Sequence, residues 1–312
     1  FEVVDLRHLG PEEQRAASAD RRARQSTRPF DLATAPMMRV LVLRLADDEH
    51  VLALCAHHIA IDGWSFGVIG RELGALYDAR VSDRAPRLAP LAADYASYAR
   101  WQRAHFTGDR RRQLLEYWRR QLGDLTPLPL GTGDRVAAAA TAARRHRFVV
   151  APALVAEVRA LAGATHATLF MVLLAAFQGV LARRTGRADI AVAVPVANRS
   201  RPEFEGLVGF FVNTLVLRTS LTGSPTGREL VARVRRVALE AYDHQECPFE
   251  QVVDELRPSR TDGRTPLTSV LFALQTAPDG GLLLPGVTAT RLINEQQRAR
   301  FDLELTLHPA AD

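Results

Sequence analysis

An apolar run at residues 51–55, Val-Leu-Ala-Leu-Cys, is followed closely by His57 and His58 and then by Asp62 and Gly63. A short continuous apolar run of this kind predicts a buried strand, which we expect to extend to His57. Imidazoles and a carboxylate at the end of a buried element need hydrogen-bond partners, because burying them unpaired destabilises a fold. The chain must therefore bring partners to this strand end, which is a candidate site of chemistry.

Geometry separates the two histidines. Side chains alternate along a strand, so His57 and His58 are expected on opposite faces, one held by neighbours and one facing a cavity. Asp62 is near enough to influence His58, or to pair with a cation and fix the turn. Gly63 allows a backbone conformation, or a close approach, that a side chain would block.

A helix is predicted directly after this turn, over residues 65–79, from apolar residues at helical spacing. Ser65 and Asp62 are both candidate N-caps for it. The histidines would then lie near a helix N-terminus, where the partial positive charge favours developing negative charge.

Two other interpretations of the paired histidines stay open. A buried histidine is usually a hydrogen-bonded core residue, although the doubled histidine followed by Asp-Gly favours chemistry. A zinc site would need Cys55 or Cys247 as a further ligand. The ligands lack the short paired spacing of structural zinc sites, so we predict no metal.

Size and charge are those of a globular enzyme. The chain has 312 residues, 47% of them hydrophobic, and can bury a sizeable core in two lobes. The net charge of +5 is mild. Arginine clusters at 110–112 and 119–120 favour a solvated helix face over nucleic-acid binding, because no aromatic side chains interleave them. They can still attract an acidic partner.

Three observations favour a cytoplasmic location without membrane contact. The two cysteines are far apart in the sequence, which is typical of a reducing compartment. No signal peptide is evident. The longest apolar run, residues 167–180, is shorter than the ~20 residues of a membrane span and predicts a buried helix.

Turn-forming residues divide the chain. Proline, glycine and then alanine concentrate in residues 126–144, which is typical of a linker. We therefore predict an N-terminal lobe at 1–125, this linker, and a C-terminal lobe at 145–312. The further elements expected are strands at 38–43, 145–150 and 190–195 and helices at 94–105, 111–122 and 153–162.

The pattern His-His-x-x-x-Asp-Gly resembles that of the condensation domains of nonribosomal peptide synthetases and their acyltransferase relatives. Further segments resemble the motifs of these domains in the same order: 94–102, 208–218, 244–253, 260–267 with Phe272, and 301–305. Two motifs expected upstream are missing, and the chain stops before the last elements of the family. We therefore expect a domain truncated at both ends.

The resemblance implies an α/β fold, an α+β sandwich of two chloramphenicol-acetyltransferase-like lobes with the active site in a tunnel between them. It implies an acyltransferase that forms a peptide bond. The donor acyl or peptidyl thioester and the acceptor aminoacyl thioester would arrive on the phosphopantetheine arms of two carrier domains, beside an adenylation domain. The domain would bind no cofactor of its own.

The same resemblance suggests roles for the paired-histidine residues. His58 would be a general base or would orient the acceptor amine. An α-amine has a pKa of ~8, so a useful fraction of it is already neutral at pH 7. His57 would be structural, and Gly63 would keep the tunnel open. Asp62 would organise the site by pairing with Arg199.

Two more supporting residues are named by the motifs. Asn213 would orient its motif or donate a hydrogen bond to the oxyanion; a purely structural asparagine at a strand end is the alternative. For Trp64 we expect a position in the core rather than contact with the substrate.

The intact histidines argue against cyclising and oxygenase-recruiting relatives, which leaves a peptide-bond-forming condensation domain. For its donor we expect the L configuration, a separate expectation that does not follow from the histidines. Two alternatives remain. One is a stand-alone acyltransferase that uses soluble thioesters, and the other is a non-catalytic scaffold that docks carrier domains.

Overall fold

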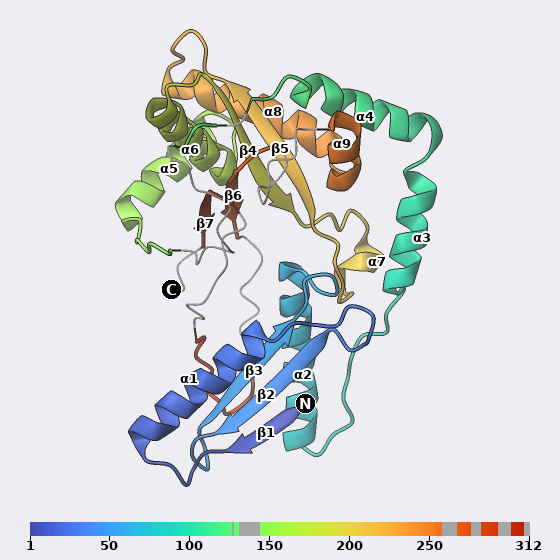
Figure 1. Cartoon of the computed structure of the whole chain (residues 1–312), viewed down its shortest axis with the longest axis vertical. Coiled ribbons are helices and arrows are strands. Elements are labelled where there is room, and N and C mark those ends of the chain that lie inside the picture. The colour runs from blue at the N-terminus through green and yellow to red at the C-terminus, as the bar shows by residue number, and fades with distance from the viewer. Residues whose placement is uncertain (127, 131–143, 258–266, 276–281, 293–300, 309–312) are drawn as a thin grey trace. The chain divides into compact units, whose positions relative to one another are not determined.

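The computed structural model describes residues 1–126, 128–130, 144–257, 267–275, 282–292 and 301–308 (Figure 1). Contacts divide the chain into two compact units, each built from three segments. Unit 1 comprises residues 1–95, 201–211 and 279–291, and unit 2 comprises residues 96–200, 212–278 and 292–312. Most of the predicted linker at 126–144 lies outside the described residues, so the lobes at 1–125 and 145–312 stay predictions.

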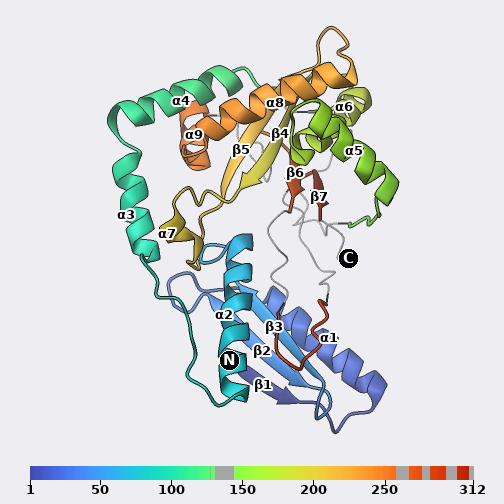
Figure 2. The same cartoon turned by 180° about the vertical axis from the view of Figure 1, so that it is seen from behind.

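Unit 1 is a three-stranded sheet with helices on both sides. Figures 1 and 2 show α1 on one side of the sheet and α2 on the other. The order is β1-β2-β3, with β1 parallel and β3 antiparallel to the central β2. Leu6, Leu41 and Leu43 form its buried cluster. Its elements are β1 (Glu2–Asp5), α1 (Pro11–Thr27), β2 (Met38–Arg44), β3 (His50–Ala56), α2 (Gly63–Val81) and the short α7 (Pro202–Glu205).

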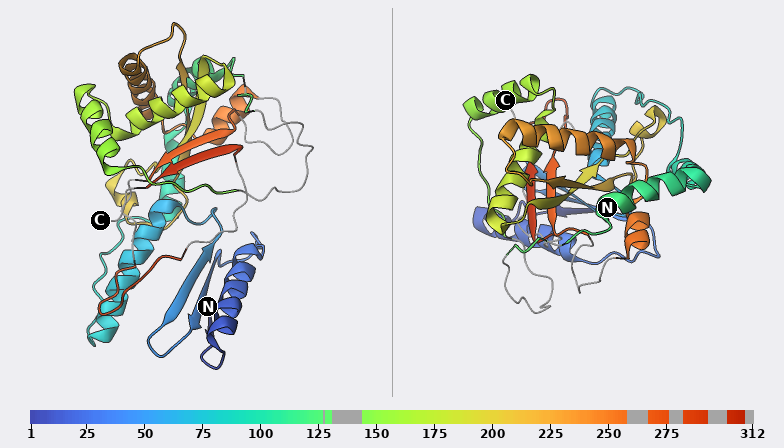
Figure 3. Two further views of the ribbon diagram at one scale, coloured as in Figure 1. Left: turned by 90° about the vertical axis from the view of Figure 1, so that its left-hand side faces the viewer. Right: turned by 90° about the horizontal axis from the view of Figure 1, so that it is seen from above.

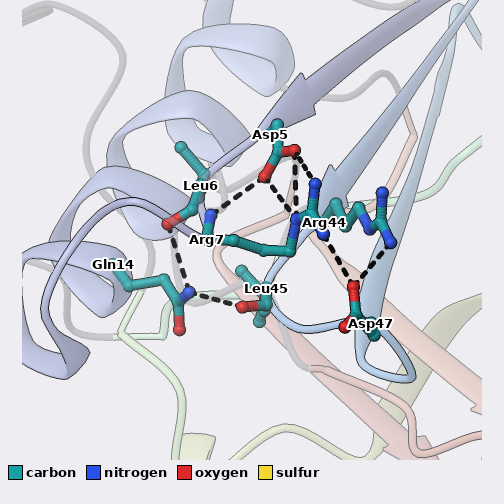
Figure 4. A network of polar contacts seen from close by, with 7 residues as sticks. All are labelled: Asp5, Leu6, Arg7, Gln14, Arg44, Leu45 and Asp47. Atoms are coloured by element: carbon teal, nitrogen blue, oxygen red, sulfur yellow. Dashed lines mark hydrogen bonds and ion pairs between the residues drawn. The ribbon is translucent and has the colours of Figure 1, made fainter.

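A polar network joins β1, α1 and the β2–β3 turn (Figure 4). Arg7 bonds both Asp5 and Asp47, each at 2.6 Å, and Arg44 reaches Asp47 at 2.7 Å. The hydrogen bonds from Arg7 hold the pKa of the Asp5 carboxyl well below its usual range. Because these groups are exposed, solvent screens the network, and its role is to fix local geometry.

Unit 2 is a four-stranded sheet of order β5-β4-β6-β7. β4 is antiparallel to β5 and parallel to β6, and β6 is parallel to β7; Figure 3 shows β6 and β7 side by side. Helices α6 and α8 pack against β4 and β5, α5 packs on α6, and α4 packs with α9. Its elements are α3 (Tyr95–His105), α4 (Gly108–Leu122), α5 (Pro152–Ala164), α6 (Leu169–Thr185), β4 (Asp189–Val196), β5 (Asn213–Ser220), α8 (Gly227–Asp243), α9 (Phe249–Leu256), β6 (Val270–Leu274) and β7 (Leu303–Leu307).

The apolar run at 167–180 is confirmed as part of a packed helix. Leu174 and Ala175 of α6 are buried in the core of unit 2. Gln178 on the same helix is fully buried, and its side-chain amide donates to the backbone oxygen of Leu217 at 3.1 Å. This bond to β5 satisfies the amide N–H, whereas Oε1 of Gln178 is buried without a hydrogen-bond partner among the described residues.

The strand predicted at 145–150 is wrong. These residues form neither strand nor helix, and most of their side chains are exposed. Their sequence predicts a strand, but no strand pairing among the described residues includes them. A strand forms only where a neighbouring strand can bond its backbone N–H and C=O groups, and the local sequence does not show whether such a neighbour exists.

No single helix among the described residues is long and apolar enough to cross a membrane. Helices α5 and α6 pass such a test together, bent by 106° at the break between them; they are part of the packed unit 2.

Candidate functional site

The turn between β3 and α2 carries both histidines. β3 ends at Ala56, and α2 begins at Gly63. The strand predicted to include His57 therefore ends one residue early, and both imidazoles lie in the turn. They contact different aromatic neighbours, Phe30 for His57 and Phe210 for His58.

His58 is exposed and held through one ring nitrogen. Its Nδ1 lies 2.6 Å from the backbone oxygen of Ile61. A carbonyl oxygen only accepts, so Nδ1 carries the hydrogen, and Nε2 of the neutral ring keeps its lone pair. The ring of Phe210 lies perpendicular to the imidazole, with centroids 5.2 Å apart. This arrangement can accept a proton at Nε2.

His57 is half-buried and bonded within the turn. Its Nδ1 accepts from the backbone N–H of Ile59 at 3.1 Å, and its own backbone N–H donates to the oxygen of Met37 at 2.9 Å. These bonds tie the turn to the start of β2. They fit a residue that holds the loop.

Asp62 is buried, and both of its carboxylate oxygens accept hydrogen bonds. Its Oδ1 receives the backbone N–H of Ser65 at 2.9 Å and the Ser65 hydroxyl at 2.7 Å. Its Oδ2 receives the backbone N–H of Phe211 at 3.1 Å. Of the two candidate N-caps, the structure selects Asp62 for α2. These bonds fit the expectation that Asp62 organises the turn, a role that stays a prediction.

Gly63 is exposed at the first position of α2. A Cβ built on it would have no heavy atom of the described residues within 4 Å, and its φ is outside the left-handed region. The backbone therefore does not require glycine here. What the glycine leaves is open space beside the turn.

Trp64 is half-buried, and its indole N–H donates to the backbone oxygen of Glu205 at 2.9 Å. The bond joins the start of α2 to α7, two segments of unit 1. Trp64 is not among the fully buried residues of the core, and its expected core position stays a prediction.

Sequence reasoning missed what residues 209–211 do. Ser65 is fully buried, and its hydroxyl accepts from the backbone N–H of Gly209 at 3.1 Å. The backbone N–H of Asp62 donates to the oxygen of Gly209 at 3.0 Å. The Gly-Phe-Phe segment was visible as a motif, but no local signal joins it to a turn more than 140 residues earlier.

Asn213 lies at the start of β5 in unit 2, and both the N–H groups and the oxygen of its side-chain amide have hydrogen-bond partners. Its two N–H groups donate to the backbone oxygens of Gln245 at 2.8 Å and Cys247 at 2.7 Å. Its Oδ1 accepts from the backbone N–H groups of Thr214 at 2.9 Å and Phe249 at 3.0 Å. With both hydrogens committed, the amide has none left for an oxyanion. The geometry favours the orienting role.

Arg199 lies in unit 2, half-buried, three residues after β4. Asp62 lies in unit 1. Their pairing stays a prediction. The motif residues 260–266 lie outside the described residues.

The described part of the chain holds no group of three or more His, Cys, Asp or Glu side chains that could bind a metal ion. Of the two cysteines, both free, Cys247 is buried, and burial raises the pKa of its thiol to about 12. A thiol that keeps its proton is a poor metal ligand.

The model of the family described as condensation domain matches residues 1–311. Among curated proteins, the chain is 43% identical to one of the linear gramicidin synthase proteins of Brevibacillus parabrevis, over 100% of this chain and 6% of that protein. It is 40% identical to phosphinothricin tripeptide synthetase PhsC of Streptomyces viridochromogenes, over 97% of this chain and 28% of that protein. The chain thus spans a small part of these relatives.

Solved structures share the fold. The X-domain from teicoplanin biosynthesis aligns with a TM-score of 0.82 and 26% identity, over 100% of this chain and 70% of that one. The first condensation domain of the calcium-dependent antibiotic synthetase, in complex with a substrate analogue, aligns with a TM-score of 0.69 and 23% identity, over 88% of this chain and 60% of that one. The chloramphenicol-acetyltransferase-like α/β fold expected from the motifs is confirmed by these neighbours.

Proposed function

Because this chain belongs to the condensation-domain family, we propose that it is an acyltransferase that forms a peptide bond between two carrier-bound substrates. The donor is an acyl or peptidyl thioester, and the acceptor is an aminoacyl thioester with a free amine. The observation that carries the proposal is the exposed imidazole of His58, whose Nδ1 is held by the Ile61 oxygen so that Nε2 is left to accept a proton.

In the proposed reaction, the acceptor nitrogen attacks the donor carbonyl carbon. The C–N bond forms, the C–S bond breaks, and the donor arm leaves as a thiol. The attacking nitrogen must lose one proton, and the departing sulfur must gain one. Nε2 of His58 takes the proton from the nitrogen and can return it to the sulfur, so atoms and charge balance. Positioned proton transfer of this kind contributes about 10²–10⁴-fold in rate.

The other residues support this step. Asp62 fixes the turn through the donors bonded to its two carboxylate oxygens, and the His57 ring accepts the backbone N–H of Ile59 within the turn. Gly63 leaves space beside the turn, which we assign to substrate. We propose that Arg199 pairs with Asp62. Asn213 supports a separate loop through its fully used amide.

Partners and location are part of the proposal. The curated relatives are much longer synthetase proteins, which supports a multidomain protein with carrier and adenylation domains beside this one. Phosphopantetheine arms of the carriers deliver the substrates, and no cofactor of the domain itself is invoked. Two free cysteines support a reducing, cytoplasmic setting.

The test uses the complete protein that carries this sequence, an acyl-loaded donor carrier and an aminoacyl acceptor carrier. Intact-protein mass spectrometry follows the product on the acceptor carrier. His58→Ala is compared with His146→Ala, which removes an exposed histidine of unit 2. We expect His58→Ala alone to lose most of the product. Equal rates in the two variants would overturn the role of His58.

A docking scaffold is the second candidate, and one observation favours it. A structure described as a complex of the X-domain and OxyB from teicoplanin biosynthesis aligns with a TM-score of 0.78 and 26% identity. A scaffold would bind carriers without making product from any pair. Turnover with soluble acyl thioesters alone would instead indicate a free acyltransferase.

A further inference from the structure

Phe210 lies against the imidazole that the proposed reaction uses. The two rings are perpendicular, with centroids 5.2 Å apart, and Phe210 is 38% exposed. The covalent bond at Cγ and the hydrogen bond from Nδ1 to the Ile61 oxygen restrain one edge of the imidazole, and no hydrogen bond to Nε2 on the opposite edge is observed among the described residues. A perpendicular aromatic neighbour supplies a second constraint.

The backbone that carries Phe210 is fixed on both sides. We call residues 209–211 the clamped segment. Asp62 accepts from the N–H of Phe211 and donates its own N–H to the oxygen of Gly209. The hydroxyl of Tyr95 donates to the backbone oxygen of Phe210 at 2.7 Å. The backbone from which the Phe210 ring reaches His58 is therefore held in place.

The Ser65 hydroxyl completes this arrangement. It accepts from the N–H of Gly209 and has two acceptors for its one hydrogen, Asp62 Oδ1 at 2.7 Å and the Gly209 oxygen at 3.0 Å. With one hydrogen, the hydroxyl serves one of them at a time. Alanine at this position would leave a buried N–H of the clamped segment without its partner.

Close packing explains why residue 209 is a glycine. A Cβ on Gly209 would lie 2.4 Å from the ring of Tyr95 and 2.7 Å from the ring of Phe211. The Phe211 ring is buried and packs edge-on against Tyr95 at 5.2 Å. The segment can approach these rings only without a side chain at position 209.

We propose that Phe210 is a positioning residue that fixes the orientation of the His58 imidazole, and that Ser65 and Asp62 hold Phe210 in place through the clamped segment. This inference rests on the proposed function for its kinetic consequence. Its geometric content does not depend on which reaction the site performs.

The kinetic test measures kcat and KM separately in the complete protein, with carrier-bound substrates. Phe210→Leu keeps an apolar side chain but removes the ring, and we expect kcat to fall about threefold to tenfold with little change in KM. Phe210→Tyr keeps the ring and should retain kcat. Phe148→Leu is the matched control, because its ring stacks on His146 in unit 2, with centroids 6.3 Å apart, and it should leave kcat unchanged.

A double-mutant cycle separates positioning from general stability. If Phe210 acts through His58, Phe210→Leu should change the residual rate of His58→Ala by less than about twofold. The same fold-loss in both backgrounds would overturn the proposal. Ser65→Ala should reproduce the effect of Phe210→Leu.

A crystal structure of the Phe210→Leu protein tests the geometry without any turnover. We expect the His58 ring to leave its position against Ile61 or to occupy several orientations. A ring that stays in place overturns the inference even if peptide bonds are formed. A displaced ring supports it even if the wild-type protein makes no product, in which case only the proposed function fails.

Discussion

In two loops of this chain, a buried polar side chain forms hydrogen bonds with the backbone of the loop. Each loop also carries a histidine, and the two histidines differ in exposure. The turn at 57–65 is organised by buried Asp62, and the loop at 244–249 by buried Asn213. Both His58 and His244 place Nδ1 against a backbone oxygen, at 2.6 Å from Ile61 and 2.7 Å from Glu240. A carbonyl partner for the ring is thus common to both loops.

The difference is what covers the rest of the ring. His244 is half-buried and lies face to face with Tyr117, with centroids 3.8 Å apart and planes 9° apart. His58 is exposed, and Phe210 meets it edge-on. A hydrogen bond that fixes the tautomer of a histidine is therefore not enough to indicate a catalytic role. The histidine to suspect is the one that is both oriented and accessible.

The largest expected effect is the loss of rate in His58→Ala. Removing the proton acceptor should lower kcat about 10²–10⁴-fold, while stability changes by less than about 0.5 kcal/mol because the side chain is exposed. His244→Ala should lower the rate per folded molecule by less than about threefold. Mass spectrometry of the acceptor carrier measures both. A larger rate loss in His244→Ala than in His58→Ala would reverse the comparison.

Asp62→Ala should act on folding. It removes an acceptor from two backbone N–H groups and one hydroxyl, and we expect a loss of about 3 kcal/mol. Hydrogen exchange followed by mass spectrometry should show faster exchange in peptides covering 57–66 and 207–212. Asp109→Ala is the control, because its carboxylate is 78% exposed, and it should cost less than about 1 kcal/mol. Unchanged exchange in the 207–212 peptide would contradict the clamp.

Asn213→Ala should destabilise the second loop by about 2 kcal/mol, because two backbone oxygens and two N–H groups lose their partner. Faster hydrogen exchange in peptides covering 244–250 measures the loss. The rate per folded molecule should stay within about threefold of wild type. A folded variant that is a hundredfold slower would favour the oxyanion role over the orienting role.

The sequence was informative where one residue type carries the signal. A turn that carries the paired histidines, Asp62 as a possible N-cap, and the strands at 38–43 and 190–195 could be predicted from local pattern. The contacts of Phe210 with His58 and of Ser65 with Gly209 could not, because they join segments more than 140 residues apart. The strand predicted at 145–150 failed for the same reason: pairing partners are a tertiary property.

The last prediction concerns Cys247, which lies in the loop of Asn213 and has no part in the proposed reaction. Burial, and next the charge of Glu250, raises the pKa of its thiol to about 12. Since the thiolate is the reactive form, alkylation of the native protein at pH 8 should be at least about a hundredfold slower at Cys247 than in the unfolded chain. Half-buried Cys55 is the internal comparison.

The same raised pKa makes stability depend on alkaline pH. The folded state keeps the Cys247 proton up to about pH 12, whereas an unfolded thiol loses it near pH ~8.5. This contribution is therefore complete below pH ~8.5 and is lost as the pH rises toward about 12. Cys247→Ala should remove that part of the decline in unfolding midpoints above about pH 9. Labelling of Cys247 at the rate of the unfolded chain at pH 8 would indicate that the loop held by Asn213 opens readily in the native protein.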